Sequence, residues 1–336
     1  MALAQCKADD EEVCSQTGLE STATTSCTSC STPASPASAS RNHLHSAIDR
    51  PAGGFSLKWR CGARFAEGSY GCLYRGFNLQ TGHIFAAKVH TMKESEAEDP
   101  ANAKRIVDRL AKLEDLRHPN IVEHFGHDFV GVNLYIYLEY VPGGSLLSML
   151  QEFGPFREPM LCRAASGLME GLDYLHSLEP PMVHGNVTSS SILVDDGGHL
   201  KLQCFQCSRH AVHEDDGCAN LESLRWLAPE VLQKQDSDRT KADIWSAGCV
   251  MIEMATAEAP WAGASLDQIL FALGGGRLAG PPLPASLSRA ARDCAAACLQ
   301  LDPDARPTAE ELLETGLLAG AEQPGPFGSA CRFYLE

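Results

Sequence analysis

The segment at residues 240–257, TKADIWSAGCVMIEMATA, most constrains what this chain can fold into. Its apolar residues occupy nearly the whole circumference of a helix and leave no polar face wide enough to meet solvent. A helix of this kind is stable only where other elements surround it. The sequence therefore predicts a large helical lobe with this segment at its centre.

The chain upstream of this segment changes its pattern near residue 145. In EPMLCRAASGLMEGLDYLHSL (158–178), apolar residues recur at the spacing of one buried helix face. From 59 to 90 the chain consists of short alternating segments broken by turn residues, GCLYRGFN (71–78) and IFAAKVH (84–90) among them, which are typical of strands in antiparallel hairpins. One helical segment (102–116) and further strand candidates follow them. We therefore expect an α+β, bilobal chain.

The predicted lobes are flanked by segments of a different composition. Residues 1–52 are rich in Ser, Thr, Ala and Pro, contain few large apolar residues, and are expected to be a disordered head. Residues 319–336 are expected to form a flexible tail. The folded domain is then 53–318, with a small β lobe with one main helix at about 57–141 and a larger, mostly helical lobe at about 142–318.

Composition excludes several classes of protein. There are 43 acidic and 27 basic residues, a formal charge of −16, so the surface repels nucleic acid and anionic lipid. No apolar run reaches the roughly 18 residues of a membrane span, and the N-terminus has no apolar signal region. We therefore expect a cytoplasmic protein whose cysteines are free thiols.

A series of short motifs carries a resemblance to a known family. They are EGSYGCLY (67–74), AAK (86–88), LRHPNIV (116–122), LEYVPGGSL (138–146), HGN (184–186), CF (204–205), WLAPEVL (226–232), DIWSAGCVMIEM (243–254) and LDPDARPTAEELL (301–313). In this order they resemble the eukaryotic protein-kinase domain of the serine/threonine type, and above all that of mitogen-activated protein kinase kinase kinases. The resemblance covers about residues 57–318 and implies a kinase-like fold with an ATP site.

The resemblance implies nucleotide-binding roles where the family pattern is kept. Gly68 and Gly71 match a glycine-rich hairpin whose backbone N–H groups approach phosphates closely, although the family's first glycine is Ala66 here. Lys88 matches the lysine that holds the α- and β-phosphates. The positions implied at the adenine are Leu73, Ala86, Glu139, Val141 and Leu193.

The departures from the family fall on the catalytic loop. Where the family has His-Arg-Asp, this chain has His184-Gly185-Asn186, and the family's following Lys and Asn are Thr188 and Ser191. The family's Asp accepts and orients the substrate hydroxyl, whereas Asn186 can hydrogen-bond that hydroxyl but cannot take its proton. Gly185 removes the Arg that would hold a phosphorylated activation loop.

The positions that ligate metal in the family also differ in this chain. The family's Asp-Phe-Gly triplet is Cys204-Phe205-Gln206, and Ser191 replaces an amide ligand. A thiol is a soft ligand, whereas Mg²⁺ prefers hard oxygen. We therefore expect ATP, if it binds, to bind weakly and without Mg²⁺.

The small-lobe helix of the family supplies a Glu that pairs with the lysine. Counting back from LRHPN places Arg109 at that position. Asp108 is adjacent, but one residue turns a helical side chain by about 100°, so pairing with Lys88 would need a one-residue shift. The framework positions implied by the family are kept: Leu113, His184, Phe205, Glu230, Asp243 and Arg306.

Three hypotheses follow. The first is a pseudokinase that acts as a scaffold or allosteric regulator, with protein kinases or their substrates as partners. The second is an active ATP-dependent serine/threonine kinase with non-standard catalytic residues. The third is a redox or metal sensor at Cys204 and Cys207; a zinc site with the second Cys-x-x-Cys pair, Cys27 and Cys30, is disfavoured because further ligands at zinc spacing are missing.

Overall fold

The computed structural model describes residues 59–68, 71–93, 100–204, 221–274, 280–315 and 318. All of these belong to one compact unit, Ser35–Glu336. The predicted head (1–52) and tail (319–336) lie outside the described residues. So do Phe205, Gln206 and Cys207.

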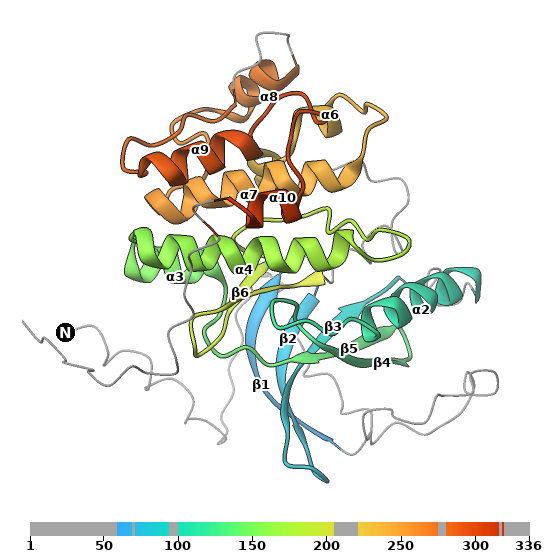
Figure 1. Cartoon of the computed structure of the whole chain (residues 1–336). Helices are drawn as coiled ribbons and strands as arrows, with labels where there is room; N and C mark the ends of the chain where they lie inside the picture. Colours follow the sequence, from blue (N-terminus) through green and yellow to red (C-terminus); the bar gives the residue numbers. More distant parts are fainter. Residues whose placement is uncertain are drawn as a thin grey trace, which may run out of the picture. The chain divides into compact units, whose positions relative to one another are not determined.

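The small lobe is built on a five-stranded antiparallel sheet (Figure 1) with the order β1-β2-β3-β5-β4. Its strands are β1 (Trp59–Gly68), β2 (Gly71–Asn78), β3 (Ile84–Thr91), β4 (His124–Val130) and β5 (Asn133–Glu139). The two hairpins β1-β2 and β2-β3 arise from consecutive alternating segments, as the sequence predicts. The long-range antiparallel pairing of β3 with β5 places the end of β5 beside the start of β3, where Glu139 is the partner of Phe85.

Helix α2 (Pro100–Glu114) covers one face of this sheet. It begins at a proline, which is favourable at the first helical position because its missing N–H has no partner there. Its buried residues Ile106, Leu110 and Leu113 recur at helical spacing and share a core with alternate sheet residues such as Ile136 and Leu138. The opposite face of the sheet carries an aromatic cluster: Trp59, Tyr74, Phe85, Tyr135 and Tyr137.

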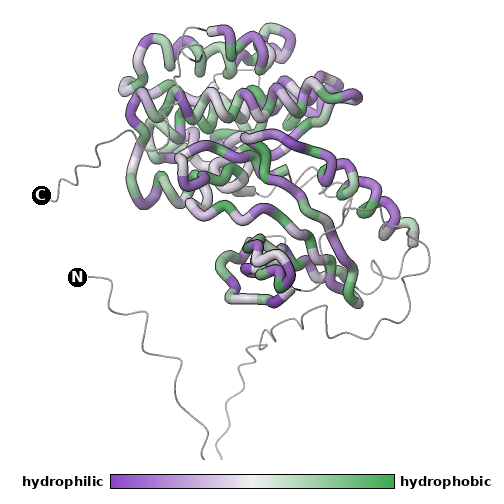
Figure 2. Tube along the Cα trace, turned by 60° about the horizontal axis from the view of Figure 1, so that its bottom comes forward, coloured by the Kyte–Doolittle hydropathy of each residue, from purple (hydrophilic) through white to green (hydrophobic). Residues whose placement is uncertain are grey.

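The large lobe is mostly helical. Its helices are α3 (Leu146–Phe153), α4 (Glu158–His176), α6 (Pro229–Leu232), α7 (Arg239–Thr256), α8 (Leu266–Gly274), α9 (Arg289–Cys298) and α10 (Ala309–Leu313), with a 3-10 turn, η2 (Leu221–Trp226). A small antiparallel hairpin, β6 (Ile192–Val194) and β7 (Leu200–Leu202), follows α4. Figure 2 shows hydrophobic and hydrophilic residues alternating along the helices, as expected where each buries one face. Among the described helices, none combines the length and apolarity that crossing a membrane requires.

Helix α7 lies between α4 and α9 and packs against both (Figure 1). Asp238 caps its N-terminus by accepting a hydrogen bond from Thr240 N, and it ends at Ala257 in the left-handed conformation. Most of its residues from Asp243 to Met254 are buried. The central helix predicted from the all-round apolar pattern is therefore confirmed, and with it the bilobal α+β fold.

One buried ion pair ties the end of the helical lobe to its middle. Arg306 donates to both carboxylate oxygens of Glu230, at 2.7 and 3.1 Å, and each residue is 1% exposed. The guanidinium also donates to the carbonyl of Lys241 at 2.6 Å and lies over the Trp245 ring at 5.3 Å. With the bond from its Nε to Gln300 O at 3.0 Å, the guanidinium makes four hydrogen bonds, which offset the desolvation that burying two charges costs.

Candidate functional site

The glycine-rich hairpin is formed by the facing ends of β1 and β2, where Gly68 and Gly71 are register partners. Gly71 has a φ of 113°, and a Cβ atom there would lie 2.0 Å from the carbonyl oxygen of Val89. A side chain at this position would therefore collide with β3. Ala66 is exposed and pairs with Leu73, so its methyl group meets no buried neighbour. Ser69 and Tyr70 lie outside the described residues.

Lys88 lies in β3, opposite Ile136 of β5, and is 7% exposed. Burial lowers the pKa of its ammonium to about 7. Ala86 is two residues away on the same strand, so it faces the same side of the sheet as Lys88, and its partner in β5 is Leu138. The cation and the apolar residue that the resemblance assigns to the nucleotide therefore share one face.

The apolar positions assigned to the adenine all belong to, or pack against, one large hydrophobic core that extends through both lobes. Ala86 and Val141 belong to the main hydrophobic core, and Leu73 and Leu193 are half-buried residues that pack against this core. They come from β3, the segment after β5, β2 and β6, which are far apart in the chain. Apolar residues from both lobes thus share one core, and their role at an adenine stays a prediction.

The segment after β5 is fixed to the large lobe by its backbone. Gly143 N donates to Val194 O at 3.0 Å, and Val194 N donates to Gly144 O at 2.9 Å. A Cβ atom on Gly143 would come within 2.4 Å of Val194 O, so this close approach needs glycine. These contacts set the position of Leu193, the residue before Val194, relative to Glu139 and Val141.

An aromatic contact at this segment was not found from the sequence. The Tyr140 ring meets the Phe65 ring edge-on at 5.5 Å, and the guanidinium of Arg75 lies 5.6 Å from the Tyr140 ring centre. Strands β1 and β2 therefore both contact the chain after β5. The sequence gives no signal for such a contact, because it depends on how strongly the hairpin curls.

The catalytic-loop backbone is held by one carboxylate of α7. Asp243 accepts hydrogen bonds from His184 N and Gly185 N, each at 2.8 Å, and lies 3.0 Å from His176 Nε2. This is the supporting role that the resemblance implies for Asp243. Gly185 has a φ of 73°, a left-handed conformation that is strained for other L-residues, and a Cβ there would meet no atom within 4 Å.

The side chain of Ser191 is used inside the loop. Its Oγ lies 2.7 Å from Asn186 O and 3.0 Å from Thr188 O, and it accepts a hydrogen bond from Thr188 N at 3.0 Å. A hydroxyl has one proton, so it donates to one of these carbonyls at a time. Both Ser191 and Thr188 are buried, and Thr188 Oγ1 lies 2.9 Å from Ser190 Oγ.

Asn186 is the half-buried residue at the position of the family's base. Within the described ranges its side chain makes no hydrogen bond, and its backbone N–H donates to His184 Nδ1 at 3.4 Å. The amide therefore remains available to a ligand as a neutral donor and acceptor, without the charge of a carboxylate.

Cys204 is fully buried within the main hydrophobic core. In the part of the chain that the structure describes, no group of three His, Cys, Asp or Glu side chains could hold a metal ion. Mg²⁺ binds through carboxylates and other hard oxygen ligands, so a buried thiol and the engaged hydroxyl of Ser191 do not fit it. The predicted pair of Cys204 with Cys207 falls partly outside the described residues.

Helix α2 does not supply a carboxylate to Lys88. Asp108 is exposed and lies away from the buried stripe of the helix, so the one-residue shift considered from the sequence does not occur. Arg109 is half-buried, and its Nη1 atom is buried without a hydrogen-bond partner. Burial, rather than the charge of Arg109, is the cause of the lowered pKa of Lys88.

Two buried titratable groups near the site escaped sequence reasoning. His124 in β4 is the register partner of Leu138, and burial lowers its pKa to about 3, helped by the charges of Lys88, Arg117 and His127. Only His124 and Asp128 are buried in β4, and the register shift between His124 and Gly126 interrupts the alternation, so strand periodicity gives no signal for this histidine. As the register partner of Leu138, His124 faces the same side of the sheet as that residue.

The second group is Glu253 of α7, which is 2% exposed. It accepts hydrogen bonds from Ser189 Oγ at 2.6 Å and from Trp226 Nε1 at 3.1 Å. Burial raises its pKa to about 7, although both hydrogen bonds act to lower it. Its signal in the sequence was that it is, with Asp243, one of two acidic residues in a mostly apolar helix.

Comparison with known proteins agrees with this geometry. The family model described as protein kinase domain matches residues 60–318. In Arabidopsis thaliana, mitogen-activated protein kinase kinase kinase YODA is 35% identical over 257 residues, which cover 76% of this chain and 29% of the relative. Mitogen-activated protein kinase kinase kinase ANP1 of the same plant is 36% identical over 271 residues, covering 79% and 40%.

A relative from a second organism has a similar identity and coverage. Mitogen-activated protein kinase kinase kinase A of Dictyostelium discoideum is 33% identical over 264 residues, covering 77% of this chain and 28% of the relative. The chain thus spans less than half the length of these relatives. Because the family model matches most of its length, the chain belongs to the protein kinase domain family.

Proposed function

We propose that this kinase-fold chain is a pseudokinase of the cytoplasm. In this role it acts as a scaffold or allosteric regulator in a signalling cascade of the MAP kinase type. It binds ATP weakly and without Mg²⁺, and it does not depend on phosphoryl transfer for its function. Its folded domain is residues 53–318, between the head and the tail.

The observation that carries this proposal is the state of the catalytic loop. Ser191 Oγ bonds Asn186 O and Thr188 N, so the side chain at a metal-ligand position supports the loop's own backbone. The loop keeps its shape through Asp243 while Asn186 offers no proton acceptor of carboxylate strength. Retention of shape without the chemical groups supports a role in binding.

The side chains at the two ligand positions that the structure describes support metal-independent binding. Metal ions normally neutralise the charge on the transferring phosphate, and catalysis of phosphoryl transfer consists largely of positioning and charge stabilisation. Here the two ligand positions hold the buried Cys204 thiol and the engaged Ser191 hydroxyl. Both effects are therefore weakened together.

The remaining nucleotide positions support ATP binding itself. Ala86 and Val141 are buried in the main core, Leu73 and Leu193 pack against it, and Lys88 lies on the same sheet face as Ala86. Partners are proposed from the relatives, whose names place them in mitogen-activated kinase cascades. Protein kinases or their substrates are therefore the expected partners of this chain.

A thermal-shift titration of the full chain with ATP tests this function, in Mg²⁺ and again in EDTA. A ligand that binds the folded state raises the melting temperature by mass action. The proposal expects equal shifts in the two buffers. A shift that grows with Mg²⁺ would show a working metal site and would overturn the proposal that ATP binds without metal. No shift with ATP in either buffer would remove ATP binding and leave the scaffold role.

An active kinase is the second candidate, favoured by the intact framework around Lys88 and Asp243. Phosphoryl transfer has a loose transition state, so losing the base slows the reaction without forbidding it. A transfer assay with radiolabelled ATP tests this candidate. Transfer that disappears in Lys88→Met would support the enzyme, whereas equal transfer in that variant would identify a contaminating kinase.

A further inference from the structure

Behind the segment that follows β5, four charged residues form a chain of contacts that the proposed function does not use. They are Arg117, Glu123, Glu139 and Lys201, and we call them the back-hinge network. The backbone of Glu139 belongs to the proposed adenine site, but its carboxylate is engaged in this network. The network is built from both lobes.

The central contact joins β7 of the large lobe to the end of β5 in the small lobe. Lys201 Nζ lies 2.9 Å from Glu139 Oε1 and 3.1 Å from Oε2. The side chains are 14% and 28% exposed, so solvent screens this pair less than it screens an ordinary surface pair. Rotating one lobe away from the other about residues 140–144 would separate these two charges.

Glu139 is also tied to the start of β4. Its backbone N–H donates to Glu123 O at 2.9 Å, and its Oε2 accepts from Glu123 N at 3.2 Å. The nearby Glu123 carboxylate would repel that of Glu139, but Arg117 Nε lies 3.1 Å from Glu123 Oε1 and Lys201 balances Glu139. The two carboxylates are therefore neighbours in the chain of contacts, and each is balanced by a cation of its own.

Arg117 carries the network to the end of α2. Its Nη1 donates to the carbonyl oxygens of Glu114 and Leu116, each at 2.7 Å. Glu114 is the last residue of α2, where carbonyl groups lack partners within the helix and a cation is favourable. The network thus connects the segment after β5 with the C-terminal end of α2.

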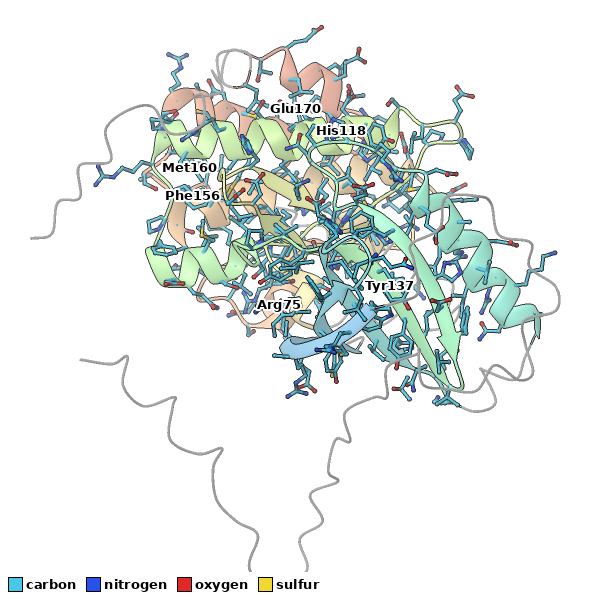
Figure 3. All side chains as sticks on the ribbon, turned by 90° about the horizontal axis from the view of Figure 1, so that it is seen from below. Arg75, His118, Tyr137, Phe156, Met160 and Glu170 are labelled. Carbon is cyan, nitrogen blue, oxygen red and sulfur yellow. The ribbon has the colours of Figure 1, made fainter. Side chains whose placement is uncertain are left out.

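The loop between α2 and β4 is in turn anchored to the large lobe. Arg117 N donates to Tyr174 Oη of α4 at 3.0 Å, and the His118 ring stacks on the Tyr174 ring at 4.9 Å. Figure 3 shows His118 beside Glu170, another residue of α4. Asn120 Nδ2 donates to Leu200 O at 2.9 Å, next to Lys201.

We propose that the back-hinge network is an electrostatic brace that holds the two lobes at a fixed angle in the nucleotide-free protein and so slows the opening through which a nucleotide enters and leaves. The expected effect on nucleotide exchange rests on the proposed function, whereas the expected effect on the movement of the lobes does not. A fixed lobe angle is useful to a domain that presents a constant surface to partners.

Hydrogen exchange of the nucleotide-free full chain tests the brace. The reporters are the amides of Glu139, bonded to Glu123 O, and Gly143, bonded to Val194 O. In Lys201→Met both amides should exchange about two- to fivefold faster, as expected for losing a partly buried ion pair. Lys201→Arg keeps the cation and should exchange as the wild type does. Equal rates in wild type and Lys201→Met would overturn the proposal.

The matched control removes a cation from a pair that stays within one helix. Arg289 and Asp293 of α9 are 3.8 Å apart and largely exposed, so Arg289→Met should leave both reporter amides unchanged. If Arg289→Met accelerates the two amides as much as Lys201→Met, the effect is general and the brace is refuted. Raising the salt concentration to about 1 M should accelerate the reporters in the wild type and much less in Lys201→Met.

Nucleotide exchange gives a separate readout. Release of a fluorescent ATP analogue, measured by stopped flow, should be about two- to fivefold faster from Lys201→Met. If the analogue does not bind any variant, the proposed ATP site fails while the amide exchange still decides the brace. If it binds, and its release and the two amides are unchanged by the substitution, the brace fails while the ATP site stands.

Discussion

Asp243 Oδ1 accepts a hydrogen bond from Gly185 N at 2.8 Å, and Gly185 is held there with a φ of 73°. The family's arginine would have to adopt this left-handed backbone, which costs an L-residue about 1–2 kcal/mol relative to glycine. Glycine avoids this cost, so the loop keeps the shape that Asp243 holds with less backbone strain than an arginine would impose.

Returning the family residue should reveal this strain. Gly185→Arg is expected to lower the free energy of unfolding by about 1 kcal/mol, because an L-residue is strained in the left-handed conformation. The cost should not be larger, because a Cβ at this position meets no atom within 4 Å. Urea denaturation measures the change. Gly185→Ala is the control, because it imposes the same backbone cost without a charge. A stabilised Gly185→Arg would mean that the arginine gains contacts exceeding the strain.

Removing the hydroxyl of Ser191 should loosen the loop. Ser191→Ala leaves the buried N–H of Thr188 without its acceptor, which is expected to cost about 1–3 kcal/mol of unfolding free energy. Amide exchange at Thr188 should rise accordingly. Ser190→Ala is the control, because Ser190 is exposed and does not bond that N–H. Equal protection of Thr188 in both variants would contradict the structural role of Ser191.

Glu253 should make stability depend on pH near neutrality. Its folded pKa is raised to about 7 from 4.5, so the folded state holds a proton that the unfolded state has lost. Its contribution to unfolding free energy is therefore greatest below the unfolded pKa. That contribution falls as pH rises to about 7 and then levels off.

The Glu253→Gln variant measures this dependence. Between pH 5 and pH 8 the unfolding free energy of the wild type should fall relative to the variant, by at most about 3 kcal/mol. The slope is the readout, because an amide N–H beside the Ser189 and Trp226 donors carries a pH-independent cost of its own. Parallel pH profiles for the two proteins would show that Glu253 does not titrate in this range.

Lys88 should make stability depend on pH in the opposite direction to Glu253. Its folded pKa is lowered to about 7 from 10.5, so the unfolded state binds more protons between these values and stability rises with pH there. Lys88→Met should flatten this rise, which amounts to about 1.4 kcal/mol per pH unit at most, and should stabilise the protein at pH 7. Denaturant titrations from pH 7 to pH 10 test it. A variant less stable than wild type at pH 7 would indicate that contacts of Lys88 outweigh its burial.

The parts of the fold that sequence predicted are those set by local periodicity. Helix α7 was predicted because its apolar residues extend around the whole helix, and the hairpins of β1, β2 and β3 because they follow each other in the chain. Nucleotide positions such as Lys88 were predicted from motifs in the right order. Whether those residues carry their proposed roles stays a prediction.

The rest depends on tertiary contacts that no local pattern contains. Lys201 and Glu139 are 62 residues apart, and nothing in either segment indicates the other as its partner. Ser191 was predicted as a degenerate metal ligand, but its bond to Asn186 O follows from the curvature of the loop. The exposure of Asp108 likewise depended on which side of α2 meets the sheet.

The close approach of Val89 O to Gly71 has a consequence for how loss-of-function variants are interpreted. Replacing a glycine of the hairpin is a natural way to disable a phosphate-binding turn. At Gly71 any side chain would strike the backbone of β3 before it could affect a ligand. A defect in such a variant would report misfolding of the sheet, so Lys88, whose side chain can be shortened without such a collision, is the safer position at which to ask whether a nucleotide matters.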